Sequence, residues 1–470
     1  MLMNMMNSVN PENGGINMAV NILENKFINS TADYNFQFVL NKNAGEKITD
    51  KEGLILQLQH LSIHGINTPL TQNKESIKSL RYRVIYLIPV FQQKTLGYYK
   101  QTTGNNGNWL NSSLVNGKKR KVYIKKIVSF KTKREERRVT SHAIRAAYAL
   151  NLDYALVKIG VTEEFKPWVL FVNPFPEGND EINSLFEQAM RDFDDKWEDI
   201  MDSDTKDAIF GADPEFVLQS PGGDMVLASK YLPKNGIAGC DRIWVNRDRS
   251  QLPLAELRPS PSSDIREFII NLYKSMLFAS KKIKNQSIKW MAGAMPIKGY
   301  PIGGHLHFSN VQLNSFLLRA LDNYLTLVVT LFEDKKGIKR RPKYGFLGDY
   351  REKFHGGFEY RTLPSWLVSP ILTKGVIALA KIIVENYTYL TQNPLQDINF
   401  QKAYYNGDKE VLKPVVLGLW EELKQLKDYH IYTKYLDPIE DLIKNDYTWD
   451  EKEDIKIAWY LPPYHKKFIR

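Results

Sequence analysis

Short apolar runs separated by polar segments dominate the first half of the chain. Residues 82–91, 154–161 and 168–172 are apolar enough to predict buried strands, whereas 142–150 has apolar residues at helical spacing. An acidic stretch over 180–204 predicts a connecting helix. Because strands and helices alternate, we predict an α/β domain here.

The second half alternates strand-like segments with longer helices. Asp264 followed by Glu267 resembles a capping box, which predicts that a helix begins there. Three long helices are predicted at about 264–284, 312–333 and 372–390, and the chain from 394 onward is mostly helical. We predict four parts: a polar region at 1–80, a basic domain at 81–204, a core domain at 205–390 and a helical region at 391–470.

Composition indicates a folded protein without disulfides. The 470 residues are 43% hydrophobic and 25% charged, which supplies a buried core and argues against disorder. Cys240 is the single cysteine, so neither an intrachain disulfide nor a cysteine-based zinc cluster can form. The best apolar run, 324–332, is too short to span a membrane, and 1–10 lacks the features of a signal peptide. We therefore expect a cytoplasmic protein without membrane contact.

The net charge of +11 is concentrated in one segment. Residues 118–138 hold eleven Lys or Arg against Glu135 and Glu136, a local charge of +9. The charges alternate with apolar residues between Val122 and Phe130, which predicts strands with one basic face. Such a face fits nucleotide phosphates or nucleic acid, but it also fits a solvated surface that keeps the protein soluble. Both interpretations stay open.

Four strand-like segments each carry two polar residues at positions i and i+2. On a strand such residues point to the same face. Taken alone, each pair is more typical of a turn, a solvated strand or a cross-strand ion pair than of a site. Together they favour one functional face. The pairs are Asp213 and Glu215, Glu256 and Arg258, His305 and His307, and Glu359 and Arg361.

If these strands share a sheet, four carboxylates, two imidazoles and two guanidiniums meet on one face. Carboxylates this close repel one another unless cations neutralise them, so a bound divalent ion is the natural resolution. Oxygen ligands with one imidazole favour Mg²⁺ or Mn²⁺ over zinc. The arginines would then bind anionic oxygens.

A basic, glycine-containing loop over 340–355 leads into the last of these strands. It suits triphosphate binding, because glycines permit close approach and cations compensate charge. An ordinary exposed loop is the alternative. Its cationic residues include Arg340, Arg341, Lys343, Arg351, Lys353 and His355.

In combination the motifs resemble the glutamine synthetase and glutamate–cysteine ligase superfamily, and within it the phage-type carboxylate–amine ligases (amidoligases). The resemblance covers about 209–390. It implies an α+β fold in which long helices pack on one face of a glutamine synthetase-like antiparallel sheet. The matching motifs are Asp213-Pro214-Glu215, Ala255-Glu256-Leu257-Arg258-Pro259, Gly304-His305-Leu306-His307, and Glu359-Tyr360-Arg361 preceded by Arg351.

The resemblance implies ATP as a substrate and two or more Mg²⁺ ions (or Mn²⁺). The metal ligands it implies are Glu215 and Glu256 for one ion, and Asp213, His305 and Glu359 for another. The nucleotide would be approached by Arg351, together with Arg341, Lys343 and Lys353. Arg361 would hold the transferred phosphoryl group or the substrate carboxylate, and His307 would act at the reacting groups. The family usually has a further acid before Glu256, and Asp241 and Asp248 compete for that place.

The implied activity is ATP-dependent formation of an amide or isopeptide bond. A substrate carboxylate attacks the γ-phosphorus to give an acyl phosphate, and an amine then displaces phosphate. The substrates, small molecules or peptides, are not named by the sequence, although Arg361 suggests an anionic one.

The first half bears a fainter resemblance to the end of an ATP-grasp domain, over 143–174. The family's metal-binding acids would fall near Lys158 and Phe171, and only Asn173 survives as a candidate ligand. The resemblance implies a degenerate domain that binds substrate or supports the second half. Two other readings remain: a nucleic-acid-binding protein that uses 118–138, and a ligase whose macromolecular acceptor docks there.

Overall fold

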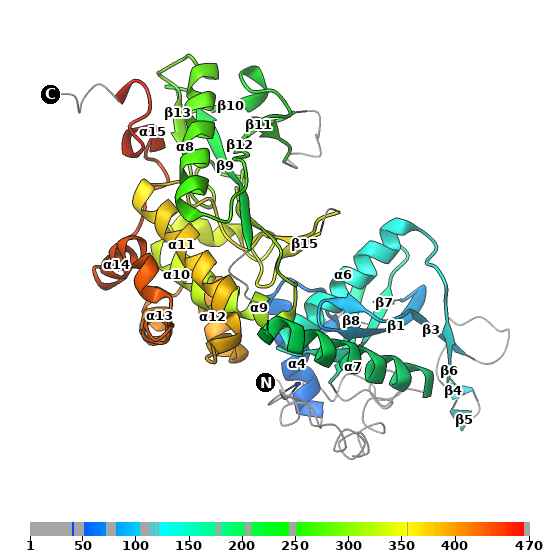
Figure 1. Cartoon of the computed structure of the whole chain (residues 1–470). Helices are drawn as coiled ribbons and strands as arrows, with labels where there is room; N and C mark the ends of the chain where they lie inside the picture. Colours follow the sequence, from blue (N-terminus) through cyan, green and yellow to red (C-terminus); the bar gives the residue numbers. More distant parts are fainter. Residues whose placement is uncertain are drawn as a thin grey trace. The chain divides into compact units, whose positions relative to one another are not determined.

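The computed structural model describes residues 40–41, 51–71, 81–103, 114–115, 118–119, 122–174, 180–202, 208–243, 251–354 and 356–464. The chain divides into two compact units, Met1–Asp199 and Ile200–Arg470 (Figure 1). Both mix helices with antiparallel sheets, so the fold is α+β. Most of the predicted polar region at 1–80, the side chains over 118–123, and residues Asp248 and His355 lie outside what is described.

The first unit is built on a six-stranded antiparallel sheet in the order β6-β3-β1-β7-β8, with β2 paired to β1. One face of β1 and β7 packs on α4 and α6 through residues such as Val90 and Val157. On the opposite face, Phe91 contacts Phe193 of α7. The elements are α4 (Lys51–Ile63), η1 (Pro69–Thr71), β1 (Val84–Phe91), β2 (Lys94–Thr95), β3 (Tyr99–Thr103), β4 (Leu114–Val115), β5 (Lys118–Lys119), β6 (Val122–Lys126), α6 (Lys133–Ala149), β7 (Tyr154–Val161), β8 (Pro167–Asn173) and α7 (Asp180–Asp202).

The basic segment is not a strand throughout. β6 ends at Lys126, and α6 begins at Lys133 rather than near 142. Thr132 caps this helix, because its side chain accepts a hydrogen bond from Glu135 N. The helix starts earlier than predicted because its first two turns are charged, and so carry little apolar periodicity.

The second unit contains an eight-stranded antiparallel sheet in the order β11-β12-β9-β14-β16-β15, with β10 and β13 also paired to β9. Its strands are β9 (Ile209–Gln219), β10 (Met225–Val226), β11 (Ala238–Asp241), β12 (Leu254–Leu257), β13 (Lys289–Met291), β14 (Gly304–Ser309), β15 (Tyr350–Glu352) and β16 (Phe358–Tyr360). Its helices are η3 (Ala228–Lys230), α8 (Ile265–Lys282), α9 (Ser315–Ala320), η4 (Leu321–Thr326), α10 (Leu327–Phe332), η5 (Lys335–Arg340), α11 (Pro370–Asn386), η6 (Tyr387–Tyr389), η7 (Pro394–Gln396), α12 (Ile398–Asn406), α13 (Lys409–Lys424), α14 (Tyr429–Lys444) and α15 (Ile455–Ala458).

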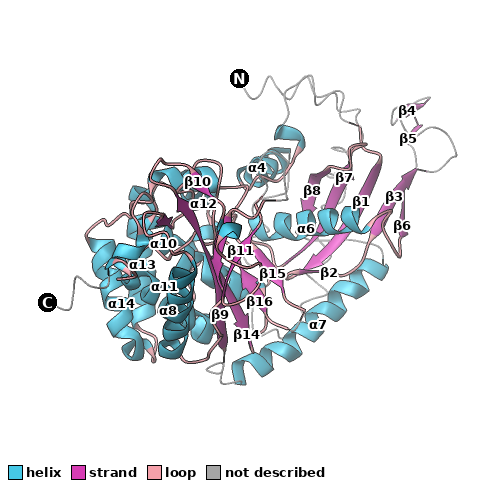
Figure 2. Ribbon diagram, turned by 90° about the horizontal axis from the view of Figure 1, so that it is seen from above, coloured by secondary structure: helices cyan, strands magenta, loops and turns pink. Residues whose placement is uncertain are grey.

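Helices cover one face of this sheet. Phe210 of β9 packs on Phe308 of β14, which packs on Phe358 of β16, at ring-centroid distances of 5.2 Å in both cases. The ammonium of Lys381, on α11, lies 5.3 Å from the centre of the Phe210 ring. Figure 2 shows α8, α11, α13 and α14 gathered on one side of β9 and β14. The opposite face of each strand is therefore available for polar side chains.

The predicted long helices are present. The carboxylate of Asp264 accepts the N–H of Glu267 at the start of α8, but Glu267 binds the hydroxyl of Ser262 instead of completing a capping box. Ser315–Phe332 forms a single helix that is long enough and apolar enough to cross a membrane, yet 89% of it is buried within the protein. This run, α9–η4–α10 with a π-helical middle, is thus a core helix.

The C-terminal residues belong to the second compact unit. Glu451 is 1% exposed, and its carboxylate accepts hydrogen bonds from Ala294 N and Met295 N. Trp459 donates its indole N–H to Leu367 O at 2.7 Å. These bonds attach the last part of the described chain to segments that precede and follow β14 in the sequence.

Candidate functional site

Strand register brings the four predicted pairs together on the face of the sheet opposite α11. Asp213 lies directly across from His305, and Glu215 directly across from Glu256. His307 lies across from Glu359, which in turn lies across from Arg351 on β15. The four carboxylates are buried, with exposed fractions between 0% and 9%. We use the name acidic face for the four predicted pairs: Asp213 and Glu215, Glu256 and Arg258, His305 and His307, and Glu359 and Arg361.

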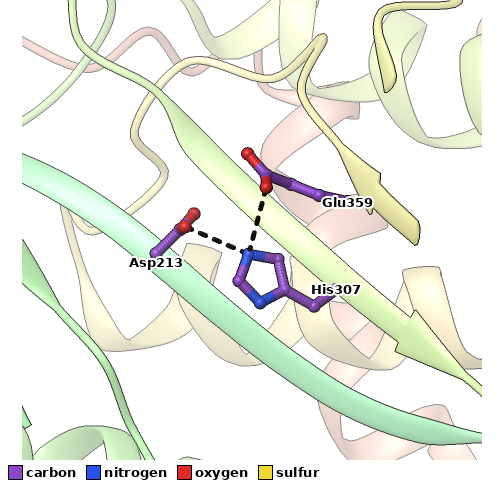
Figure 3. Close-up of side chains that lie close together, drawn as sticks. All are labelled: Asp213, His307 and Glu359. Atoms are coloured by element: carbon purple, nitrogen blue, oxygen red, sulfur yellow. Dashed lines mark ion pairs between the residues drawn. The ribbon is translucent and has the colours of Figure 1, made fainter. Parts of the chain in front are cut away.

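At the centre of the acidic face, one imidazole nitrogen points at two carboxylates (Figure 3). Nε2 of His307 lies 3.1 Å from Asp213 Oδ2 and 3.9 Å from Glu359 Oε2. This nitrogen is buried and forms no hydrogen bond among the described residues. The three side chains can offer ligand atoms that all lie within 4.8 Å of one another. Two carboxylates and an imidazole nitrogen so placed could hold a divalent cation.

His305 is bound differently from His307. Its Nδ1 lies 3.0 Å from Asp213 Oδ1, within hydrogen-bond distance, and 3.5 Å from Glu359 Oε1. Burial acts to lower the pKa of His305, but the charge and hydrogen bond of Asp213 together with the charge of Glu215 outweigh burial and raise it. The contact between His305 and Asp213 orients both side chains.

Glu359 is neutralised by cations from two directions. Arg351 donates its Nε to Glu359 Oε2 at 2.9 Å, and Lys353 and Arg361 form ion pairs with the same carboxylate. Burial and the charge of Asp213 act to raise the pKa of Glu359, but His305, Lys353 and Arg361 outweigh them and lower it.

The other end of the acidic face lacks comparable compensation. Glu256 pairs with Arg258 at 2.6 Å, yet burial and the charge of Asp213 raise the pKa of Glu256 to about 8. Glu215 accepts the N–H of Gly303 at 2.6 Å, and burial raises its pKa as well. A bound cation would stabilise the ionised forms of these two carboxylates.

Asp241 is at the same end of the acidic face. It is an exposed residue at the end of β11 and lies two residues from Gly239, which pairs with Glu256. Its charge contributes to raising the pKa values of both Glu215 and Glu256. Of the two acids that compete for a place beside Glu256, Asp241 lies at this end of the sheet, whereas Asp248 lies outside the described residues.

The structure does not bring all the cations of the 340–355 loop to the acidic face. The guanidinium of Arg341 is buried, pairs with Glu333 and donates to Tyr404 O at 2.8 Å. Lys343 is exposed and lies over the ring of Tyr344. In the described part of the chain, neither has an ion pair or hydrogen bond to the acidic face. Arg351 and Lys353 do reach it, because β15 pairs with β16.

Arg340 and Ser365 have supporting roles that the sequence did not reveal. Arg340 is buried, and its guanidinium donates to Thr362 O at 2.8 Å and Leu363 O at 2.9 Å, just beyond Arg361. Ser365 donates to the main-chain oxygen of Glu215. A basic loop residue gives no sequence signal that its partners are carbonyl groups twenty residues later, and neither does an isolated serine.

The fold and this site define a class of protein: an α+β protein with a buried carboxylate–imidazole centre suited to divalent cations. The sequence matches the family described as Phage phiEco32-like COOH.NH2 ligase-type 2 over residues 210–461, more than half of its length. The chain therefore belongs to this family of carboxylate–amine ligases. The matched range contains every residue of the acidic face.

Solved structures show weaker likeness. A bifunctional glutathione synthetase from Pasteurella multocida is 10% identical, with a TM-score of 0.36 over 57% of this chain and 53% of that one. A D-alanine–D-alanine ligase from Bacillus anthracis complexed with ATP is 14% identical (TM-score 0.19; 32% and 50%). A novel glutamine synthase homologue is 10% identical (TM-score 0.24; 51% and 70%). The chain spans about half the length of the first two. No curated protein matches.

Proposed function

We propose that the chain is an ATP- and Mg²⁺-dependent carboxylate–amine ligase whose active site is the acidic face. The observation that carries the proposal is the group formed by Asp213, His307 and Glu359, in which a buried imidazole nitrogen without a hydrogen bond faces two carboxylates. Family membership supports the reaction class. The ATP dependence, the bound metal ions and the acyl-phosphate intermediate are part of this proposal.

Two cation positions follow from the donor atoms. Asp213, His307 and Glu359 would hold one ion, while Glu215 and Glu256, with Asp241, would hold a second. This exchanges the roles expected for the two imidazoles, because Nδ1 of His305 is already engaged with Asp213. The bound ions would neutralise phosphate charge and polarise the phosphoryl group that is transferred.

The cations around Glu359 have a second use in this proposal. Arg351 is exposed over 57% of its side chain, so it can turn from Glu359 toward a triphosphate once a metal ion replaces its charge at that carboxylate. Lys353, which pairs with the same carboxylate, can do so as well. Arg361, fixed between Glu359 and Asp349, would hold the phosphoryl group or the substrate carboxylate.

The reaction would proceed in two balanced steps. A carboxylate oxygen of the substrate attacks the γ-phosphorus. The bond between that phosphorus and the β–γ bridging oxygen breaks, so that ADP departs and an acyl phosphate remains. An amine nitrogen then attacks the acyl carbon, inorganic phosphate departs, and the amine gives up a proton. The chain supplies positioning and charge compensation rather than a nucleophile. The substrate pair would be an anionic carboxylate and a small-molecule or peptide amine.

The test is phosphate release from ATP and Mg²⁺ with pooled amino acids, di- and tricarboxylates and polyamines. We expect release to depend on the pool and to fall at least about 100-fold in Glu359→Gln, which removes a ligand charge. Glu352→Gln is the matched control, because Glu352 is exposed on β15 and pairs with Phe358 of the apolar face. Equal activity of Glu359→Gln and the native chain would refute the site. Failure of the native chain to bind ATP or Mg²⁺ would refute the proposal.

A further inference from the structure

A strongly basic surface lies on the first unit, which the proposed ligase site does not use. It comprises Lys131, Lys133, Arg134, Arg137 and Arg138, all exposed or half-buried at the start of α6; we call it the α6 basic face. Arg134, Arg137 and Arg138 line a shallow hollow of about 300 Å³ with Ser141 and His142. Three guanidiniums around one hollow form a surface for several anionic oxygens.

The acids within this segment are turned away from the α6 basic face. Glu135 is 2% exposed and binds Arg83 and the hydroxyl of Tyr86. Glu136 accepts the hydroxyl of Tyr98. The carboxylates are therefore held by Arg83, Tyr86 and Tyr98, whereas three arginines of the α6 basic face line the hollow. The positive surface is not cancelled by its own sequence neighbours.

The position of these cations works against the helix. The N-terminal end of a helix carries a partial positive charge, which favours acidic residues and disfavours basic ones. Four of the five cations of the α6 basic face lie in the first two turns of α6. Packing does not require them, since the buried side of the helix is formed by residues such as Val139 and Ala143. A bound polyanion would remove this repulsion.

We propose that the α6 basic face binds a nucleic-acid strand through its phosphate backbone, without base specificity. Arg134 is three and four residues from Arg137 and Arg138, so these side chains are neighbours on one face of the helix, about 5–6 Å apart at Cβ. That arrangement lets successive guanidiniums contact successive phosphates bidentately. Two exposed apolar residues precede the α6 basic face in the chain: Val128 is 98% exposed and Ile124, on β6, is 41% exposed. These apolar side chains can contact the sugars and bases of a nucleic acid, groups that an acidic peptide does not have.

The surface has a defined limit on one side. Arg138 donates to Phe165 O at 3.0 Å in the turn between β7 and β8, and the neighbouring Glu163 and Glu164 are exposed. Arg138 thus has a structural bond, whereas Arg134 and Arg137 are exposed side chains that can be changed without breaking a buried contact. The informative variant is Arg134→Gln with Arg137→Gln.

The experiment measures binding of a fluorescent oligothymidylate to the full chain by anisotropy, across a series of NaCl concentrations. We expect binding that weakens with salt. In the double variant, affinity should fall about tenfold and the salt slope should decrease by about 1–1.5, because each lost phosphate contact contributes about 0.7 for a single strand. Lys402→Gln with Lys434→Gln removes the same charge from exposed positions of the second unit and should leave both values unchanged.

The inference would be overturned by no binding by the native chain at low salt, by native-like binding by the arginine variant, or by equal loss in the lysine control. Competition by poly-glutamate as effective as that by oligothymidylate would assign the surface to acidic peptides instead. Arg134→Lys with Arg137→Lys should retain the salt slope, which separates loss of charge from loss of folding. Because the readout is binding, failure here leaves the ligase proposal untouched.

Discussion

At the scale of single residues, the acidic face distinguishes two histidines that the sequence presents as equivalent. His305 and His307 both point to the same face and both lie close to Asp213, but only the contact of His305 has hydrogen-bond geometry. The unsatisfied nitrogen belongs to His307. Two side chains of one motif thus have separate tasks, one orienting a carboxylate and the other left with an available lone pair.

The raised pKa of Glu256 predicts that metal binding depends on pH. Since this pKa is about 8 in the metal-free protein, the carboxyl holds its proton at neutral pH, and a metal ligand must lose it. Mg²⁺ affinity should rise by up to about tenfold per pH unit and level off above pH about 8. Calorimetry in buffers of different ionisation enthalpy should detect the released proton.

Glu256→Gln provides the control for that experiment. The amide cannot ionise, so the variant should bind Mg²⁺ more weakly and should lose this part of the proton release. If the native chain and the variant release the same number of protons, the titrating group is not Glu256.

The sequence predicted which residues share the acidic face better than it predicted their contacts. Alternation along a strand is a local property, so the spacing of Asp213 and Glu215 was sufficient to place both on one face. The destination of Arg341 is not local, because Glu333 and Tyr404 must first fold against it. The basic loop therefore looked like a uniform set of phosphate ligands, although its buried arginines support the structure.

At the scale of elements, β14 depends on the absence of a side chain just before it. A Cβ on Gly303 would lie 2.3 Å from Nε2 of His305, and the N–H of Gly303 binds Glu215. Gly303→Ala should displace the imidazole and weaken Mg²⁺ binding on the order of tenfold, while the sheet persists. Titration calorimetry with Mg²⁺, combined with circular dichroism, measures both effects.

Gly418→Ala is the matched control, since a Cβ there meets no atom within 4 Å on α13. It should stabilise the helix by about 1 kcal/mol without changing metal affinity. Unchanged Mg²⁺ binding by Gly303→Ala would contradict the contact with His305.

Most helices and strands were predictable because their apolar periodicity is strong. The predictions for 264–284 and 372–390 correspond to α8 and α11. The start of α6 was missed because its first two turns, with Lys133, Arg134, Arg137 and Arg138, have almost no apolar face of their own. Element boundaries in charged sequence are decided by capping and tertiary contacts instead.

At the scale of the whole molecule, the carboxylate of Glu451 joins the C-terminal residues to the rest of the second unit. Its pKa predicts how the stability of the chain depends on pH. Burial raises the pKa of Glu451 to about 7, against two backbone N–H bonds that lower it. The folded chain therefore binds a proton that the unfolded chain releases at lower pH. This contribution to stability is complete below the unfolded pKa and is lost as pH rises toward 7, by up to about 3 kcal/mol.

Chemical denaturation of native chain and Glu451→Gln over this pH range is the measurement. The native chain should lose stability relative to the variant as pH rises, and the difference should level off above about 7. Glu453→Gln, a change at an exposed neighbour, should follow the native curve. Parallel curves for the native chain and Glu451→Gln would contradict the assignment.

The register of the second sheet also determines when the acidic face can form during synthesis of the chain. The acidic face draws on β9, β12, β14 and β16, so its first carboxylate, Asp213, is synthesised well before its last, Glu359. Until β16 pairs with β14, the group of Asp213, His307 and Glu359 does not exist. Under the proposed function, a nascent or truncated chain without β16 has no complete centre for ATP, and the activity begins only when the sheet is complete.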